Sequence, residues 1–221
     1  MAARQLSSML DSLAADPHAP TTVRMPAQAL HTHLSDSLVA LELPDVRAAN
    51  AIADLGAGAG FPGLPLAAAL PAAEVVLVES VARKCAFIRT AADAAGLTNV
   101  EVLPDRAESW SAGLGTRDLV TARALAPLAV LAEYAAPLLH AGGVLVAWKG
   151  RRDAEEERDA AAAAEQLGLT VEEVRPVHPY PAAEHRHLHV LRKVAPTPER
   201  FPRRPGMARK RPLGAGNRPA L

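Results

Sequence analysis

The chain has little cysteine, few aromatic residues and no excess of either charge. Its 221 residues include one cysteine, Cys85, and 3% aromatic residues. A single cysteine excludes a framework of internal disulfides and is typical of a reducing compartment, so we expect a cytoplasmic protein. No apolar stretch reaches the 18 or so residues of a membrane span without charge or proline, so we expect no membrane partner. The first residues contain early acids and no compact apolar block, which predicts no secretion signal.

The net charge of zero conceals an uneven distribution. Nine of the 24 Lys and Arg residues lie in residues 192–221, together with one of the 24 acids, Glu199. The preceding 191 residues therefore carry 15 bases and 23 acids. A basic segment rich in Pro and Gly suits a phosphate backbone. It is equally consistent with a solubilising end, and both interpretations stay open at this point.

The most informative stretch runs from Ala51 to Leu70, AIADLGAGAGFPGLPLAAAL. A short apolar strand over residues 51–55 leads into glycines 56, 58, 60 and 63, and an apolar run typical of a helix follows. Glycine allows positive φ and has no Cβ, so a ligand can lie against bare backbone there. The amides at the start of the helix then face that ligand.

Strands and helices alternate after this turn. Strands are predicted at 51–55, 74–79, 100–103, 118–121, 144–148, 170–177 and 187–194, with helices at 81–95, 128–139 and 153–167. This alternation predicts an α/β fold with a mostly parallel sheet of seven strands, and the last two strands form an antiparallel hairpin. Residues 1–49 read as an N-terminal helical extension, 50–194 as the main domain and 195–221 as a basic, flexible tail.

The glycine turn alone leaves several nucleotide-like ligands open. The dinucleotide pattern G-x-G-x-x-G fails from Gly56, because Phe61 stands at its last position. Counted from Gly58 it is met, although Pro62 directly precedes the third glycine. A phosphate loop is excluded more clearly, because no Gly-Lys-Ser/Thr follows.

The later strands each end near a residue that can contact a ligand. Glu79 lies 21 residues beyond Gly58, where a carboxylate can accept hydrogen bonds from two ribose hydroxyls. Further candidates follow the third, fourth and fifth strands, namely the DRAE segment at 105–108, Arg123 and Lys149. Because open α/β sheets bind ligands at the carboxyl ends of their strands, these residues predict one site.

Two groups of histidines could suggest a metal. His31 and His33 precede Asp36 and Ser37, and histidines 185, 187 and 189 alternate along one predicted strand. No carboxylate or cysteine completes a ligand set for the second group. We therefore expect no metal, and capping, structural or RNA-facing roles for these side chains.

Several segments in order resemble the successive motifs of the RsmG (GidB) family of methyltransferases. They are DLGAGAGFPGLPLA, VLVES-VARKCAFI, DRAESW, VTARALAPL, VAWKG and HRHLHVLRK, and HLSDSL and RFPRRPGMARKRPL are also similar. The resemblance implies a Rossmann-like class I fold dependent on S-adenosylmethionine. It implies cofactor contacts at Gly56, Phe61, Ala107, Glu108 and Arg123, and methyltransferase folds generally imply Glu79 as the ribose ligand.

The resemblance also implies the reaction, methyl transfer to N7 of a guanine in the 530 loop of bacterial 16S rRNA. Guanine N7 has a lone pair and no proton, so no general base is expected, and Lys149 is a candidate for positioning the target. Candidates for RNA contact share a positive charge: Lys149, Arg186, Arg203, Arg204, Arg209, Lys210 and Arg211. The expected partner is 16S rRNA or the small ribosomal subunit, bound by a monomer. A small-molecule methyltransferase and a non-catalytic ribosome-binding factor of the same fold are the alternatives.

Overall fold

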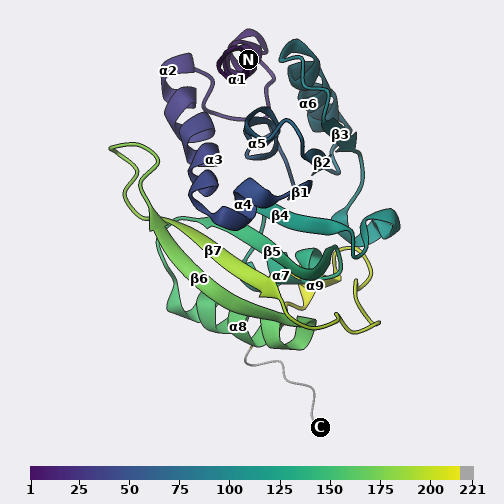
Figure 1. Ribbon diagram of the computed structural model, residues 1–221. Coiled ribbons are helices and arrows are strands. Elements are labelled where there is room, and N and C mark those ends of the chain that lie inside the picture. Colours follow the sequence, from purple (N-terminus) through teal and green to yellow (C-terminus); the bar gives the residue numbers. More distant parts are fainter. Residues whose placement is uncertain (215–221) are drawn as a thin grey trace. The chain divides into compact units, whose positions relative to one another are not determined.

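The structure, a computed structural model, describes residues 1–214 and divides into two compact units (Figure 1). The first unit comprises residues 1–105 and 178–184, and the second the remaining described residues. Each unit contains part of the strands and its own helices.

The first unit is built on three parallel strands, β1 (Ala51–Leu55), β2 (Glu74–Val78) and β3 (Val100–Leu103), in the order β3-β2-β1. β1 pairs with β2 from Ala51↔Glu74 to Leu55↔Val78. β1 and β2 are almost entirely buried, as expected for parallel strands covered on both faces. Because the strands are parallel, their carboxyl ends share one edge, where the glycine turn begins.

Helices pack around these strands. They are α1 (Ala2–Ala15), α2 (Pro26–Ala29), the π-helical η1 (Leu30–Ser35), α3 (Asp36–Leu38), the 3-10 turn η2 (Val39–Glu42), α4 (Pro44–Ala48), α5 (Gly63–Ala69) and α6 (Ala82–Ala94). α1 buries Met9 and Leu13, and it packs against α5 and α6. Residues 26–48 of the predicted helical extension thus form a run of short helices of three kinds, α, π and 3-10.

The second unit contains β4 (Arg117–Arg123), β5 (Leu139–Lys149), β6 (Leu169–Val177) and β7 (Arg186–Lys193), in the order β4-β5-β7-β6. β4 and β5 are parallel, whereas β7 is antiparallel to both β5 and β6. The helical elements are η3 (Ala107–Ser109), η4 (Ser111–Gly113), α7 (Leu128–Ala135), α8 (Ala154–Leu167) and α9 (Met207–Lys210).

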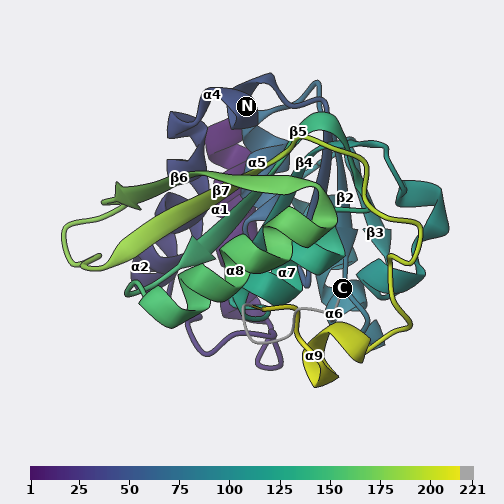
Figure 2. The same ribbon diagram turned by 90° about the horizontal axis from the view of Figure 1, so that it is seen from below.

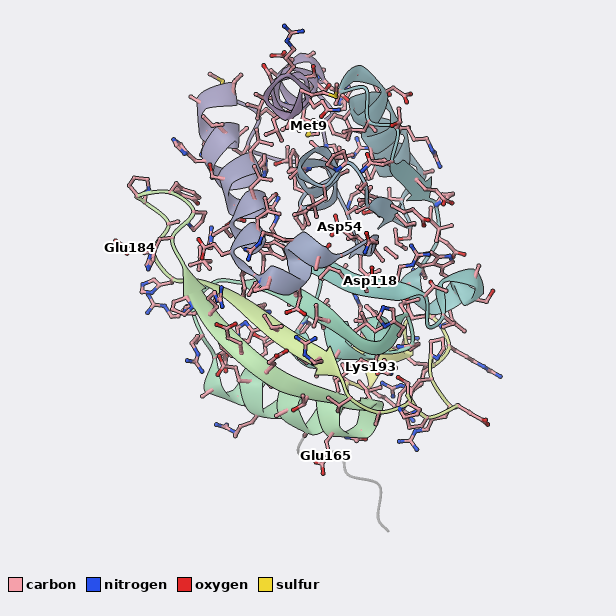
Figure 3. The ribbon with its side chains drawn as sticks, in the orientation of Figure 1. Met9, Asp54, Asp118, Glu165, Glu184 and Lys193 are labelled. Atoms are coloured by element: carbon pink, nitrogen blue, oxygen red, sulfur yellow. The ribbon has the colours of Figure 1, made fainter. Side chains whose placement is uncertain are left out.

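One face of these four strands is covered by α7 and α8, which lie side by side (Figure 2). α8 begins at the cap Asp153, whose side chain accepts from the amides of Glu155 and Glu156, and it ends at Gly168 with φ 74°. Alanines 160, 163 and 164 line its buried face. Glu165 on the opposite face points away from the sheet (Figure 3).

The seven strands, their mostly parallel arrangement, the antiparallel hairpin and the N-terminal helices confirm the predicted fold class. Several predicted boundaries were wrong. α7 ends at Ala135 rather than Leu139, and β5 begins at Leu139 rather than Val144. Pro137 cannot continue a helix, and the carbonyl of Leu138 accepts from the amides of Thr116 and Arg117 beside β4. β4 and β5 also extend further than predicted, so Arg123 and Lys149 are the last residues of these strands and not loop residues.

The predicted division at residues 49/50 and 194/195 stays a prediction. Within the predicted tail, residues 195–214 are described, and they include the buried side chains of Phe201 and Ala208. The part of the predicted flexible tail at 215–221 lies outside the described residues. Among the described helices, none is both long enough and apolar enough to cross a membrane.

We predict that Asn99→Ala lowers the free energy of unfolding by about 1–3 kcal/mol. The Asn99 amide nitrogen donates to the carbonyls of Ala67, Leu70 and Ala73, and so fixes the end of α5 against β2. Urea unfolding measures the effect, with the exposed neighbour Thr98→Ala as the matched control. Equal midpoints for the two variants would contradict this account of the turn.

Candidate functional site

The glycine turn after β1 requires glycine at three positions. Gly56, Gly58 and Gly60 have φ of 65°, 61° and 91°, in the left-handed region that other residues adopt with strain. At Gly60 a Cβ would also lie 2.4 Å from Leu64 Cδ1. The amide of Gly56 donates to the Val78 carbonyl at 2.8 Å, which holds the turn to the end of β2.

Glu79 directly follows β2 and binds this turn. One carboxylate oxygen accepts from the amide of Gly58 at 3.1 Å, and the other accepts from the amide of Val81 at 2.9 Å. The Lys84 ammonium lies 3.8 Å from the first oxygen. Glu79 is 6% exposed, and its carboxylate has about four acceptor sites. It can therefore hold the turn and still accept from a ligand's hydroxyls.

Asp54 on β1 organises the other end of the turn. It is fully buried, and its Oδ2 accepts from the amide of Gly63, the first residue of α5, at 2.9 Å. A Cβ on Gly63 would lie 2.9 Å from that oxygen and 2.9 Å from Leu77 Cδ2. The fourth glycine is thus required by packing and not by its φ. The sequence analysis assigned no role to Asp54, and the available signal was a single acid near the end of an apolar strand.

Phe61 lies inside the fold, 5% exposed. Its ring stacks on that of His33, with 4.7 Å between centroids and 13° between planes. His33 Nε2 lies 3.1 Å from both the Thr21 hydroxyl and the Val23 carbonyl. One face of the Phe61 ring is therefore covered by a histidine from the N-terminal segment, which the sequence did not reveal.

The predicted site residues divide between the units. Gly56, Phe61 and Glu79 belong to the first unit, and the glycine turn and Glu79 are in direct contact. Ala107, Glu108 and Arg123 belong to the second unit. Within it, Ala107 and Glu108 form η3, which packs against α7, and Arg123 ends β4.

Lys149 is bound within the second unit. Its ammonium donates to Glu156 Oε1 at 2.6 Å, and both side chains are about one-fifth exposed. The same oxygen accepts from the amide of Leu128, the first residue of α7, at 2.8 Å. Lys149 thus joins the end of β5 to the starts of α7 and α8.

The other basic candidates differ in their surroundings. Arg203 makes a two-pronged ion pair with the buried Glu133, whereas Arg209 is exposed and donates to the Leu125 carbonyl at 3.0 Å. Arg186 at the start of β7 is half-buried. The exposed members of the set are Arg204, Arg209, Lys210 and Arg211.

The strand histidines are used structurally. His187 Nδ1 lies 2.8 Å from the Gly150 carbonyl, and the buried His189 donates from Nε2 to Glu157 at 3.1 Å. His189 Nδ1 is buried and has no hydrogen-bond partner among the described residues, and burial lowers the pKa of His189. Arg152 holds both oxygens of Glu157 and lowers the pKa of that carboxyl to about 2. Among residues 1–214, no three His, Cys, Asp or Glu side chains gather as a metal site.

Cys85 is fully buried in α6, and its thiol donates to the Glu79 carbonyl at 3.0 Å. Burial and the charge of Glu79 raise the pKa of the thiol. The thiolate needed for nucleophilic attack is therefore disfavoured here.

Comparisons with known proteins identify the same family. A model of "rRNA small subunit methyltransferase G" matches residues 8–188. A protein of that name from Chloroflexus aggregans is 44% identical over 87% of this chain and 82% of its own. Another, from Roseiflexus, is 45% identical over 82% of this chain and 78% of its own.

Solved structures share the fold. A predicted O-methyltransferase, Atu636 from Agrobacterium tumefaciens, has a TM-score of 0.56 and 29% identity over 73% of this chain and 80% of its own. A SAM-dependent methyltransferase from Aquifex aeolicus has a TM-score of 0.60 and 18% identity over 85% of this chain and 98% of its own. This chain therefore shares the fold of its sheet and helices with methyltransferases that carry different names.

We predict that Glu79→Gln lowers the free energy of unfolding by about 1–3 kcal/mol, without any ligand present. The amide group of glutamine must present a donor to the amide of either Gly58 or Val81, both of which need an acceptor. Glu74→Gln at the exposed start of β2 is the matched control. A urea midpoint unchanged in the Glu79 variant would refute the bridging role.

We also predict that the contribution of His189 to stability falls as the pH is lowered from about 7 to 5, while His140, whose pKa is raised by its hydrogen bond to Asp118, contributes in the opposite direction. The unfolded chain takes up a proton at His189 near its ordinary pKa, whereas the folded chain does so only at its lower pKa. Glu157 adds a further loss below about pH 4.5, as the pH approaches its folded pKa of about 2. Urea midpoints of His189→Gln should vary less between pH 7 and 5 than those of the exposed control His178→Gln. Identical slopes in both variants would contradict this assignment.

Proposed function

We propose that this chain, which belongs to the rRNA small subunit methyltransferase G family, transfers a methyl group to N7 of a guanine in the 530 loop of 16S rRNA. The chain is an S-adenosylmethionine-dependent rRNA methyltransferase. The observation that supports its cofactor site most directly is the carboxylate of Glu79 bound to the amide of Gly58.

The residues of the first unit fit an adenosine-like group. The turn at Gly56, Gly58 and Gly60 exposes backbone without Cβ atoms, and Glu79 retains acceptor capacity for ribose hydroxyls. In the second unit we assign Ala107 and Glu108 to the adenine side and Arg123 to the cofactor's carboxylate. The cofactor, when bound, supplies an electrophilic methyl group on a sulfonium.

The chemistry assigned to this chain needs positioning more than proton transfer. Guanine N7 carries a lone pair and no proton, so no side chain has to act as a base. Orientation of two reactants in such a site supplies up to roughly 7–11 kcal/mol. The TARALAP segment around Arg123 lacks the N/D-P-P-Y/F sequence that grips an exocyclic amine, and the Cys85 thiol is buried. Both observations support N7 over an amine or a ring carbon as the acceptor.

For the RNA we assign phosphate contacts to exposed cations. Arg204, Lys210 and Arg211 are exposed in the basic segment, and Arg186 is half-buried at the start of β7. Phosphate contacts position RNA without reading its sequence. Lys149 would position the target only by sharing or exchanging its bond to Glu156. We propose that the protein acts as a cytoplasmic monomer on 16S rRNA or the small subunit.

The test combines cofactor binding with mapping of the product. Gly56→Asp should abolish calorimetric binding of S-adenosylmethionine, because its side chain enters the space of the bare turn and adds negative charge. Gly96→Asp is the matched control: it has φ of 62°, like the 65° of Gly56, and a Cβ there meets nothing within 4 Å. The control should bind as the unmodified chain does.

Purified small subunits and naked rRNA should then be incubated with the protein and the cofactor, and the modified position mapped. Methylation at N7 of one guanine in the 530 loop supports the proposal. Modification at another position would overturn the assigned acceptor. Binding to subunits without any methyl transfer would favour a non-catalytic factor, and transfer to small molecules alone would favour the other alternative.

A further inference from the structure

We infer that residues 201–211, here called the C-terminal strap, position the cofactor-binding segments of the second unit. The inference rests on the proposed function, because it takes Ala107, Glu108 and the end of β4 as those segments. The strap was expected to contact RNA, and its exposed cations remain available for that. Its bonded atoms, however, point to a second role within the protein.

The first attachment is to Glu108. The amide of Gly206 donates to Glu108 Oε1 at 3.0 Å, so the carboxylate of the predicted adenine segment is fixed by the strap. Gly206 has φ of 81°, a conformation that glycine adopts without strain. The strap thus reaches η3 through the one residue type suited to that turn.

The second attachment is to the segment after β4. Arg209 on α9 donates to the carbonyl of Leu125, two residues beyond Arg123, at 3.0 Å. Burial raises the pKa of the Tyr134 hydroxyl on α7, and the charge of the nearby Arg209 guanidinium opposes this rise. α9 and η3 both pack against α7, so a single helix supports both attachments.

The strap is anchored by a largely buried ion pair. Arg203 donates to both carboxylate oxygens of Glu133, which is 2% exposed, and also to the Arg211 carbonyl at 2.9 Å. Phe201 and Ala208 are buried on either side of this pair along the chain. A buried carboxylate that loses its partner is strongly destabilising, so Arg203 holds the strap in place. Part of the basic segment therefore neutralises acids of the same chain.

The test separates this role from RNA binding by using two neighbouring cations of α9. Arg209→Ala and Lys210→Ala each remove one exposed positive charge, but of the two only Arg209 donates to the Leu125 carbonyl. The dissociation constant of S-adenosylmethionine is measured by calorimetry in the full chain without RNA. We expect it to rise about tenfold in Arg209→Ala and to stay within about twofold in Lys210→Ala.

Steady-state kinetics supply the second measurement. The KM for rRNA should rise by similar factors in both variants, whereas the KM for the cofactor should rise in Arg209→Ala alone. Arg203→Lys keeps the charge beside Glu133 but loses the two-pronged geometry, and it should also weaken cofactor binding. Thermal unfolding checks that each variant is folded, and if Arg209→Ala is not, Arg203→Lys decides.

If folded Arg209→Ala and Arg203→Lys bind the cofactor as tightly as the unmodified chain does, the proposed positioning role of the strap is wrong. A rise shared equally by Arg209→Ala and Lys210→Ala would also overturn it, because only charge would then matter. Failure of the unmodified chain to bind S-adenosylmethionine is a different result, and it would count against the proposed function itself.

Discussion

The carboxylate of Glu79 is the group on which the glycine turn depends. It accepts from amides on both sides of the strand end, Gly58 before it in the chain and Val81 after it. A turn with three left-handed glycines has little intrinsic preference for one conformation, since glycine loses more backbone entropy than other residues. Two hydrogen bonds to one ionised group offset that cost. Asp54 does the same for the first amide of α5, so two acids fix the turn from adjacent strands.

Acids also organise the second unit, where each one fixes the start of an element or a distant segment. Glu156 accepts from the first amide of α7 and from Lys149 at the end of β5, and Glu133 holds Arg203, 70 residues away in sequence. Exposed ion pairs contribute little to stability, but these are partly or fully buried and bond to backbone as well. An acid from the acid-rich residues 1–191 and a cation from the basic C-terminal segment thus pair inside one unit of the molecule.

The sequence predicted the strands and the glycine turn because both depend on local pattern. β1 and β3 were predicted to the residue, since apolar runs and flanking glycines suffice to define them. The parallel pairing of β1 and β2 brings the ends of both strands together, and this places Glu79 beside the turn. The stacking of His33 on Phe61 and the bond of Glu108 to Gly206 were not predictable, because each joins residues distant in sequence through a particular side-chain geometry. The early start of β5 depends on backbone pairing with residues 115–117, which no local pattern reveals.

The choice of acceptor is the property that the fold determines least. Solved structures of the same fold include a predicted O-methyltransferase, and one fold commonly serves different acceptors. For a nucleophile that carries a lone pair and no proton, selection must come from how the RNA is held. Lys149 would have to give up its 2.6 Å bond to Glu156 before it could hold a phosphate. The carboxylate of Glu156, which also accepts from the first amide of α7, would then lose its neutralising cation. The exposed cations of the C-terminal segment carry no such cost, so we propose that they make the first phosphate contacts and that Lys149 engages only when the target base is in place.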